Sequence, residues 1–280
     1  MVLERIDLYK YFGIKRESGA EGYLNAYISH TSNEYCGNRV RPAMLVIPGG
    51  GYQMRSDREN EPVAFKFLAE GYNCFTLEYS LNPLGYPTQL IEGAMAVAYI
   101  KENAEKMHIL KDKVCAIGFS AGGHLAGMLA TLYDAEPVKD ALKEKSALAK
   151  LNAVILSYPV ISAFDTHEDT MNTISNNDRA LREYLSLENR VNTKSVPAFI
   201  WATFDDNDVP STNSMKMATA YQKNGVKCEL HMFKSGVHGL SLATNETARE
   251  GDVRYINPEV AKWFDMSISW LKGLGFDFIK

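Results

Sequence analysis

One short segment of the sequence has the composition of a turn that presents a nucleophile: Gly118-Phe119-Ser120-Ala121-Gly122. The apolar run at 113–118 predicts a strand before it, and an apolar helical pattern follows at 122–133. A sharp strand-to-helix turn needs glycine on both sides of the serine, because a Cβ there would clash with the strand or the helix. The helix N-terminus also supplies N–H groups and partial positive charge for a developing oxyanion. The pattern alone occurs by chance on ordinary tight turns, but this setting favours Ser120 as a nucleophile.

A glycine-rich loop follows the apolar run at 43–47, which also predicts a strand. Its sequence is Pro48-Gly49-Gly50-Gly51-Tyr52. Consecutive glycines expose backbone N–H groups that no side chain obstructs, as the stabilisation of an oxyanion requires. We expect the N–H groups of Gly50 and Gly51 to act together with that of Ala121, and Tyr52 to contact the substrate. A phosphate-binding loop is the alternative, which the absence of a GxxxxGKS or GxxxxGKT motif disfavours.

A serine hydroxyl needs a general base to become a nucleophile near neutral pH, and His238 is the expected base. It lies in the loop Ser235-Gly236-Val237-His238-Gly239, directly after the apolar run at 227–233. Of the six histidines, it is the one that lies in a glycine-flanked loop late in the chain. His231 falls within the strand pattern, and His124 falls in the helix after Ser120, where we expect it to pack or to hydrogen-bond locally.

The base in turn needs a carboxylate that orients it, and one loop offers three candidates. Asp205, Asp206 and Asp208 follow the apolar run at 198–203. Asp205 comes first after the strand and is the preferred acid, with Asp206 as the alternative. Asp208 ranks third, because it is placed to cap the helix that begins near Ser211.

Short apolar segments alternate with helical patterns along the chain, and this alternation predicts a doubly wound, mostly parallel α/β sheet with helices on both faces. Ligands of such sheets bind beyond the C-terminal ends of the strands. The residues described above all follow predicted strands, so we expect them to meet at that edge. The expected strands are 21–29, 43–47, 72–78, 113–118, 153–158, 198–203 and 227–233, and the expected helices are 61–70, 88–107, 122–133, 211–224 and 258–273.

The overall composition is that of a soluble globular protein, with 46% apolar and 23% charged residues in a chain of 280. The net charge of −4 argues against nucleic acid or an anionic membrane as the main partner. The four cysteines show no paired spacing, so free thiols are expected rather than a disulfide or a metal site. No run approaches the roughly 18 apolar residues of a membrane span, and no apolar leader is visible, so a cytoplasmic protein is expected.

We expect a single domain over residues 1–280, since no repeat, low-complexity tract or linker divides the chain. Its catalytic core is expected at about 43–275. The connection at 159–196 is long for this kind of sheet and predicts a small cap over the site. The sequence does not determine the oligomeric state, and a homo-oligomer is compatible with it. Several side chains in or beside the cap segment are expected to face the substrate: Tyr158, Phe164, His167, Tyr184 and Leu185.

With these residues assembled, the chain resembles the α/β-hydrolase superfamily. Within it, the chain is similar to the bacterial BD-FAE-like esterases, which include acetylxylan-esterase-like and feruloyl-esterase-like enzymes, some of them labelled xylanase B. The resemblance covers about residues 43–275. It rests on PGGGY (48–52), GYNCFTLEYSL (71–81), GFSAGGHLA (118–126), LSYPVIS (156–162), DDNDVPSTNS (205–214) and SGVHGLSLA (235–243).

The resemblance also bears on individual residues. The dipeptidyl-peptidase and prolyl-oligopeptidase branch has a similar Asp-Asp loop whose first aspartate belongs to the triad, which implies Asp205 here. Two positions depart from the esterase pattern. Glu78-Tyr79-Ser80 stands where members often have Asn-Tyr-Arg, which would alter the packing beneath the glycine loop, and Glu92 stands where an aspartate is common.

Together these features predict a serine carboxylesterase that needs no metal or organic cofactor. The partner is a small-molecule ester, and the resemblance implies a short acyl group, such as acetyl on an oligosaccharide. An exopeptidase of the oligopeptidase branch is one alternative, but the 42 residues before the strand at 43–47 leave no room for the β-propeller that such enzymes usually add. A catalytically silent hydrolase fold used for binding is another, which the intact order of serine, aspartate and histidine disfavours.

Overall fold

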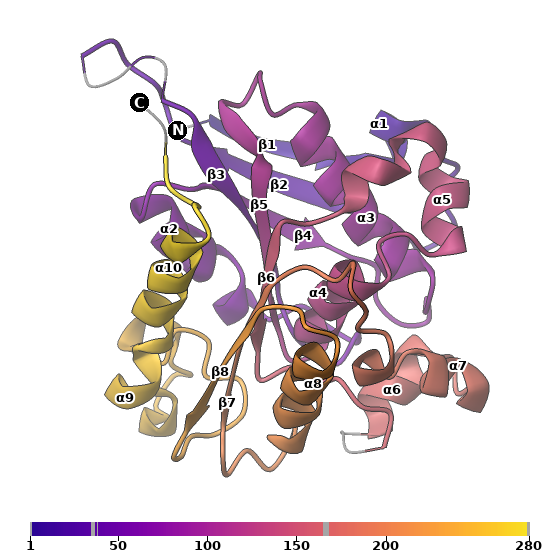
Figure 1. The fold of residues 1–280 in the computed structure, drawn as a ribbon, viewed down its shortest axis with the longest axis vertical. Coiled ribbons are helices and arrows are strands. Elements are labelled where there is room, and N and C mark those ends of the chain that lie inside the picture. Colours follow the sequence, from indigo (N-terminus) through magenta and orange to yellow (C-terminus); the bar gives the residue numbers. More distant parts are fainter. Residues whose placement is uncertain (1, 35–36, 38, 165–167, 279–280) are drawn as a thin grey trace.

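The computed structural model describes residues 2–34, 37, 39–164 and 168–278. Eight strands within them form one sheet: β1 (Val2–Asp7), β2 (Tyr23–Ile28), β3 (Arg41–Ile47), β4 (Asn73–Glu78), β5 (Ile109–Phe119), β6 (Ala153–Ser157), β7 (Ala198–Thr203) and β8 (Cys228–Phe233). Their order across the sheet is β1-β2-β4-β3-β5-β6-β7-β8 (Figure 1). β1 pairs with β2, and β2 with β4, in antiparallel fashion, and all the remaining pairings are parallel.

Helices cover both faces of this sheet (Figure 1). The α-helices are α1 (Leu8–Phe12), α2 (Glu61–Ala69), α3 (Thr88–Glu102), α4 (Ala121–Thr131), α5 (Glu136–Leu142), α6 (Glu168–Ile174), α7 (Arg179–Tyr184), α8 (Thr212–Lys223), α9 (Pro258–Ala261) and α10 (Trp263–Gly273). Short 3₁₀ turns lie at η1 (Asp57–Glu59), η2 (Lys143–Ala149), η3 (Leu187–Asn189), η4 (Asn245–Thr247) and η5 (Val253–Tyr255). One apolar cluster joins α3, α4 and α8 to the sheet, and a second joins α2 and α10 to the opposite face.

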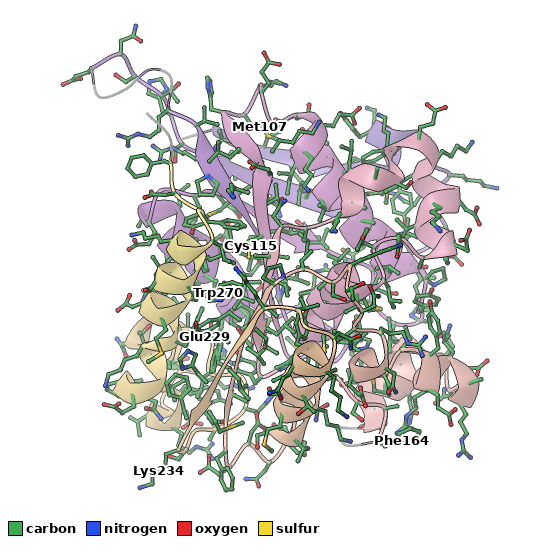
Figure 2. All side chains as sticks on the ribbon, viewed as in Figure 1. Met107, Cys115, Phe164, Glu229, Lys234 and Trp270 are labelled. Atoms are coloured by element: carbon green, nitrogen blue, oxygen red, sulfur yellow. The ribbon has the colours of Figure 1, made fainter. Side chains whose placement is uncertain are left out.

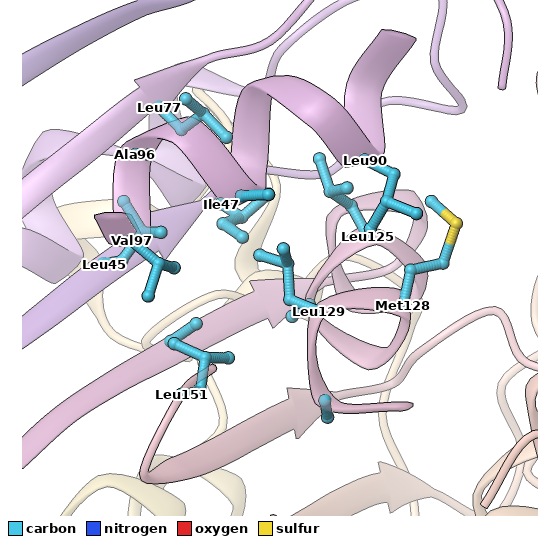
Figure 3. Packing of buried hydrophobic residues seen from close by; sticks show 14 of the residues in the cluster. Leu45, Ile47, Leu77, Leu90, Ala96, Val97, Leu125, Met128, Leu129 and Leu151 are labelled. Carbon is cyan, nitrogen blue, oxygen red and sulfur yellow. The ribbon is translucent and has the colours of Figure 1, made fainter. Parts of the chain in front are cut away.

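The central strands are buried on both sides, which explains why their sequences are apolar runs rather than alternating patterns. Every residue of β3, β6 and β7 is buried. Figure 3 shows how α3 and α4 place their leucines over β3, and each buried leucine stabilises the fold by about 1.5–3 kcal/mol relative to an exposed one. The cluster there includes Leu45, Ile47, Leu90, Val97, Leu125 and Leu129.

The predicted sheet and its helices are confirmed, and the structure adds helices that were not predicted: α5, α6 and α7. The sequence pattern did not indicate β1 or α1, and the helix expected over 88–107 ends at Glu102. Cys74, Cys115 and Cys228 are free thiols, whereas Cys36 lies outside the described residues. Over the described ranges, no helix has both the length and the apolar character needed to cross a bilayer.

The predicted cap segment at 159–196 contains α6, α7 and η3. Its aromatic residues do not face a substrate site as expected. Phe164 is 63% exposed at the periphery (Figure 2), and Tyr184 packs against Tyr86 with ring centroids 5.9 Å apart. Leu185 is fully buried, and His167 lies outside the described residues. The role of the segment as a cap stays a prediction.

Candidate active site

Three side chains from separate loops form a hydrogen-bonded chain at the C-terminal edge of the sheet. The Oγ of Ser120 lies 2.8 Å from Nε2 of His238, and Nδ1 of the same ring lies 2.7 Å from Oδ2 of Asp206. Since a carboxylate can only accept, the tautomer that satisfies both contacts carries its proton on Nδ1. Nε2 is then free to accept the serine proton, as a general base must.

The local backbone presents Ser120 at the end of β5. Its φ of 52° and ψ of −118° lie outside the helical and extended regions, so the residue is strained. The fold holds it there, because its N–H donates to the carbonyl of Ser157 at 3.0 Å and its carbonyl accepts from Val160 at 3.1 Å. A Cβ on Gly122 would lie 2.3 Å from the carbonyl oxygen of Ile47, so the turn requires glycine at this position. The predicted strand–turn–helix setting of Ser120 is therefore what the structure shows.

The acid that contacts the histidine is Asp206, not Asp205, which corrects the preferred assignment. Asp205 is exposed, and its carboxylate accepts from the N–H of Gly236 at 2.7 Å. Asp206 is 5% exposed, and its Oδ1 accepts from the N–H groups of Asp208 and Val209 at 3.0 and 2.9 Å. The tight turn after β7 sends successive side chains in different directions, and only the second carboxylate faces the imidazole. The resemblance to the peptidase branch pointed to the wrong residue.

Asp208 does not cap the following helix either. α8 begins at Thr212, and its N-terminus has no side-chain cap. Asp208 instead lines the cavity in front of Ser120.

The environment of His238 favours its protonated form. Burial lowers the pKa of the imidazole, but the hydrogen bond and charge of Asp206 raise it, as do the charges of Glu59 and Asp208. The net effect is a pKa above the ordinary 6.5. A base of this kind accepts a proton readily and then holds it as imidazolium while a new bond forms.

The glycine loop folds back beside Ser120. Gly50 has a φ of 126°, a conformation that favours glycine, and a Cβ there would lie 2.3 Å from the carbonyl oxygen of Met54. The N–H of Gly49 is occupied, because it donates to Oε2 of Glu59 at 2.8 Å. Gly50 and Gly51 line the same cavity as Ser120. Ala121 is the first residue of α4, where backbone N–H groups lack helical partners. Their predicted role as oxyanion donors remains a proposal.

The two tyrosines predicted to bind substrate do not line the cavity. Tyr52 is fully buried, and its hydroxyl lies 2.9 Å from Nδ1 of His124. Nε2 of His124 meets the carbonyl of Leu185 at 2.9 Å, and burial lowers the pKa of this histidine to about 4, so it is a neutral, local hydrogen-bonding residue as expected. Tyr158 is 2% exposed, and its ring stands edge-on to His238 with centroids 5.1 Å apart. Tyr52 therefore packs against His124 in α4, and Tyr158 packs against His238.

A cavity of about 550 Å³ opens in front of the serine. Its walls come from the glycine loop, η1, α6 and the segments around His238 and Arg249. The sequence patterns did not identify most of these lining residues, because they lie in irregular segments without periodicity. The charged run at 55–59, directly after the glycine loop, was the one signal that could have indicated them. The lining residues are Gly50, Gly51, Met54, Ser56, Asp57, Arg58, Glu59, Ser120, Thr170, Asp208, Val209, His238, Gly239 and Arg249. Among the side chains that the structure places, no group of three His, Cys, Asp or Glu could hold a metal ion.

Comparison with known proteins identifies the family. The BD-FAE family profile matches residues 33–221. An endo-1,4-beta-xylanase B from Butyrivibrio fibrisolvens is 38% identical over 215 residues, which cover 74% of this chain and 33% of that protein. An acetylxylan esterase from Xylanibacter ruminicola is 30% identical over 216 residues, which cover 72% of this chain and 42% of that protein. The match thus spans less than half the length of either relative.

A solved structure extends the likeness over nearly the whole chain. The α/β hydrolase MGS-M1, from a Medee basin deep-sea metagenome library, superposes with a TM-score of 0.77 at 34% identity and covers 98% of this chain and 97% of its own. The chain therefore belongs to the BD-FAE family and has the α/β-hydrolase fold. The predicted resemblance and the predicted fold class are confirmed.

Proposed function

We propose that this member of the BD-FAE family is a serine carboxylesterase that works through an acyl-enzyme. The observation that carries the proposal is the hydrogen-bonded chain from Ser120 through His238 to Asp206. A buried carboxylate, a correctly oriented imidazole and a partly exposed serine hydroxyl together form the arrangement that acyl transfer requires. No step needs a metal ion or an organic cofactor.

In the first half-reaction, Nε2 of His238 takes the hydroxyl proton while Oγ of Ser120 attacks the ester carbonyl. The tetrahedral intermediate collapses, the bond to the alcohol oxygen breaks, and the imidazolium returns its proton to the leaving alcohol. Water then enters, loses a proton to the same nitrogen and attacks the acyl-serine. Collapse of the second intermediate releases the carboxylic acid and restores the serine hydroxyl. Asp206 keeps the ring in one tautomer and stabilises the imidazolium in both halves.

The oxyanion of each tetrahedral intermediate is assigned to the N–H groups of Gly50, Gly51 and Ala121. The positions of the glycines beside Ser120, and of Ala121 at the start of α4, support this assignment. Gly49 cannot serve, since its N–H is already bonded to Glu59. Removal of one donor from an oxyanion site costs about 10²–10³ in kcat.

For the substrate we propose a short acyl ester, acetyl above all, on a carbohydrate. The naming of the Xylanibacter relative as an acetylxylan esterase supports this choice. The cavity supports it as well, because polar side chains able to hydrogen-bond to sugar hydroxyls predominate in its lining, including Ser56, Asp57, Thr170 and Arg249. Met54 and Val209 are its two apolar side chains.

The test is hydrolysis of p-nitrophenyl acetate by the wild type and by Ser120→Ala. We expect turnover that the substitution reduces by several orders of magnitude, with unchanged thermal unfolding. No turnover by the wild type, or full turnover by the variant, would reject the proposal. Acetylated xylo-oligosaccharides, feruloyl esters and aminoacyl anilides then rank the substrate classes, and we expect the acetylated sugars to give the highest kcat/KM.

A further inference from the structure

A second buried carboxylate, Glu59, borders the catalytic cavity and takes no part in the triad. It is 2% exposed and lies in η1, between the glycine loop and α2. Both of its oxygens are occupied. Oε2 accepts from the N–H of Gly49 at 2.8 Å, and Oε1 accepts from the hydroxyl of Tyr158 at 2.7 Å. One side chain therefore joins the glycine loop to the residue that packs against His238.

Tyr158 links Glu59 to the loop after β8, which carries His238. Its hydroxyl accepts from the N–H of Ser241 at 2.9 Å, and its ring stands edge-on to the imidazole of His238. The hydroxyl of Ser241 donates in turn to the carbonyl of Arg58 at 2.6 Å, which returns the network to η1.

The neighbouring residue in η1, Arg58, also binds the segment after His238. Its guanidinium donates to the carbonyls of Gly239 and Thr247, each at 2.8 Å. Arg58 directly, and Glu59 through Tyr158, thus hold this segment from one short turn. Because the turn also holds Gly49, the spacing between the glycine loop and His238 depends on it.

The charge of Glu59 acts on the same histidine. The charged groups near His238 are Asp205, Asp206 and Asp208 from the loop after β7, Asp57, Arg58 and Glu59 from η1, and Arg249 and Arg254 from the segment before α9. Of these, Asp206, Glu59 and Asp208 each raise the pKa of His238. A side chain that only connected the two loops would not need a negative charge. Burying a carboxylate costs free energy unless hydrogen-bond donors satisfy it.

We propose that Glu59 is a positioning residue of the esterase reaction: through Gly49 it aims the N–H groups of Gly50 and Gly51, and through Tyr158 and its own charge it holds His238 ready for protonation. This proposal rests on the proposed function for the identity of the reaction. Glu59 then joins Asp206 as a second carboxylate that acts on His238, but it does so through Tyr158 and its charge and not by direct contact.

Two substitutions of Glu59 separate the effect of its negative charge from the effect of its hydrogen bonds to Gly49 and Tyr158. In Glu59→Gln the amide oxygen can still accept from Gly49, but the amide nitrogen then faces the Tyr158 hydroxyl, which loses its acceptor. The negative charge is lost. In Glu59→Asp the charge stays, but the shorter side chain cannot span both partners. The matched control is Glu61→Gln, because Glu61 also accepts from a tyrosine hydroxyl, that of Tyr27 at 2.7 Å, yet does not line the catalytic cavity.

The experiment measures the second-order rate of phosphorylation of Ser120 by diisopropyl fluorophosphate across pH 5 to 9. In this reaction Oγ bonds to phosphorus, fluoride leaves, and His238 takes the hydroxyl proton. It reports on the serine and histidine without any assumption about the natural ester. If the wild type is phosphorylated normally but hydrolyses no ester, that result counts against the proposed function and leaves the test of Glu59 intact. Thermal unfolding of each variant confirms that it is folded, and Glu59→Asp supplies the test if Glu59→Gln does not fold.

We expect both Glu59 variants to react about 10–100-fold more slowly than the wild type at pH 8, as misplaced catalytic groups do. The acid limb of the profile should move to lower pH by roughly half a unit in Glu59→Gln and stay in place in Glu59→Asp, because only the first loses the charge that raises the pKa of His238. Glu61→Gln should match the wild type. Rates within about twofold of wild type for both Glu59 variants, an unmoved limb in Glu59→Gln, or an equal loss in Glu61→Gln would each overturn the proposal.

Discussion

The assignment of Asp206 as the triad acid can be tested by exchanging each neighbouring aspartate for asparagine. The two side chains are adjacent in sequence, yet only one contacts the imidazole. In Asp206→Asn, the side chain has two possible orientations. If its oxygen faced His238, the amide NH₂ would point at the N–H groups of Asp208 and Val209, which now donate to Oδ1. Placing donors against buried donors costs about 1–3 kcal/mol for each unsatisfied group.

The variant therefore turns its amide nitrogen toward the ring. This nitrogen donates to Nδ1, which moves the imidazole proton to Nε2, where it opposes the hydroxyl of Ser120. The ring can then no longer accept the serine proton. A tautomer error of this kind lowers kcat by about 10⁴, equivalent to about 5 kcal/mol of transition-state stabilisation. Asp205→Asn keeps an oxygen for the N–H of Gly236 on an exposed loop, and we expect a change below about threefold.

The assay is kcat/KM on p-nitrophenyl acetate for both variants, with thermal unfolding to show that each is folded. Asp206→Ala serves as a second variant that cannot revert to aspartate by deamidation. Activity of Asp206→Asn within tenfold of wild type would refute the reasoning. So would a loss beyond a hundredfold in Asp205→Asn, because that residue would then be acting as the acid.

Three further predictions concern stability. Gly122→Ala should lower the free energy of unfolding by about 1–3 kcal/mol in urea titrations, since its Cβ would meet the carbonyl of Ile47 at 2.3 Å; an unchanged midpoint would contradict this. Burial lowers the pKa of His124 to about 4, so the unfolded chain binds a proton that the folded state refuses, and stability falls as pH drops from about 6.5 to 4. The loss should approach about 3 kcal/mol, and His124→Gln should show a shallower slope in this window. Burial raises the pKa of Glu92 to about 7, so here the folded state keeps a proton that the unfolded chain releases, and stability falls as pH rises from about 4.5 to 7. Unfolding of Glu92→Gln between pH 5 and 8 should lack this decline, and an identical pH dependence in both proteins would exclude it.

The sequence predicted the features that follow from local patterns. Apolar runs identified the parallel strands, and glycine spacing identified the turn at Ser120, because both signals reside in neighbouring residues. The choice between Asp205 and Asp206 was beyond such signals, since it depends on how one turn after β7 directs two successive side chains. The tyrosines show the same limit. Tyr158 was expected to face substrate, yet it is buried under His238 by contacts with Glu59 and Ser241, residues far from it in the chain.

The two departures from the family pattern contact each other. Ser80, which stands where members often have arginine, donates its N–H and its hydroxyl to Glu92 at 2.7 and 2.5 Å, and Tyr9 donates its hydroxyl to the same carboxyl at 3.0 Å. A short serine in place of an arginine leaves space, and a glutamate, one methylene longer than the common aspartate, reaches across it. Burial raises the pKa of Glu92, the hydrogen bonds from Ser80 and Tyr9 oppose that rise, and the charge of Glu21 adds to it.

The hydroxyl of the neighbouring Tyr79 donates to the carbonyl of Pro48 at 2.8 Å. That bond supports the glycine loop directly. The glycine loop is therefore held at adjacent residues, Pro48 by Tyr79 and Gly49 by Glu59, neither of which belongs to the pair Ser80 and Glu92.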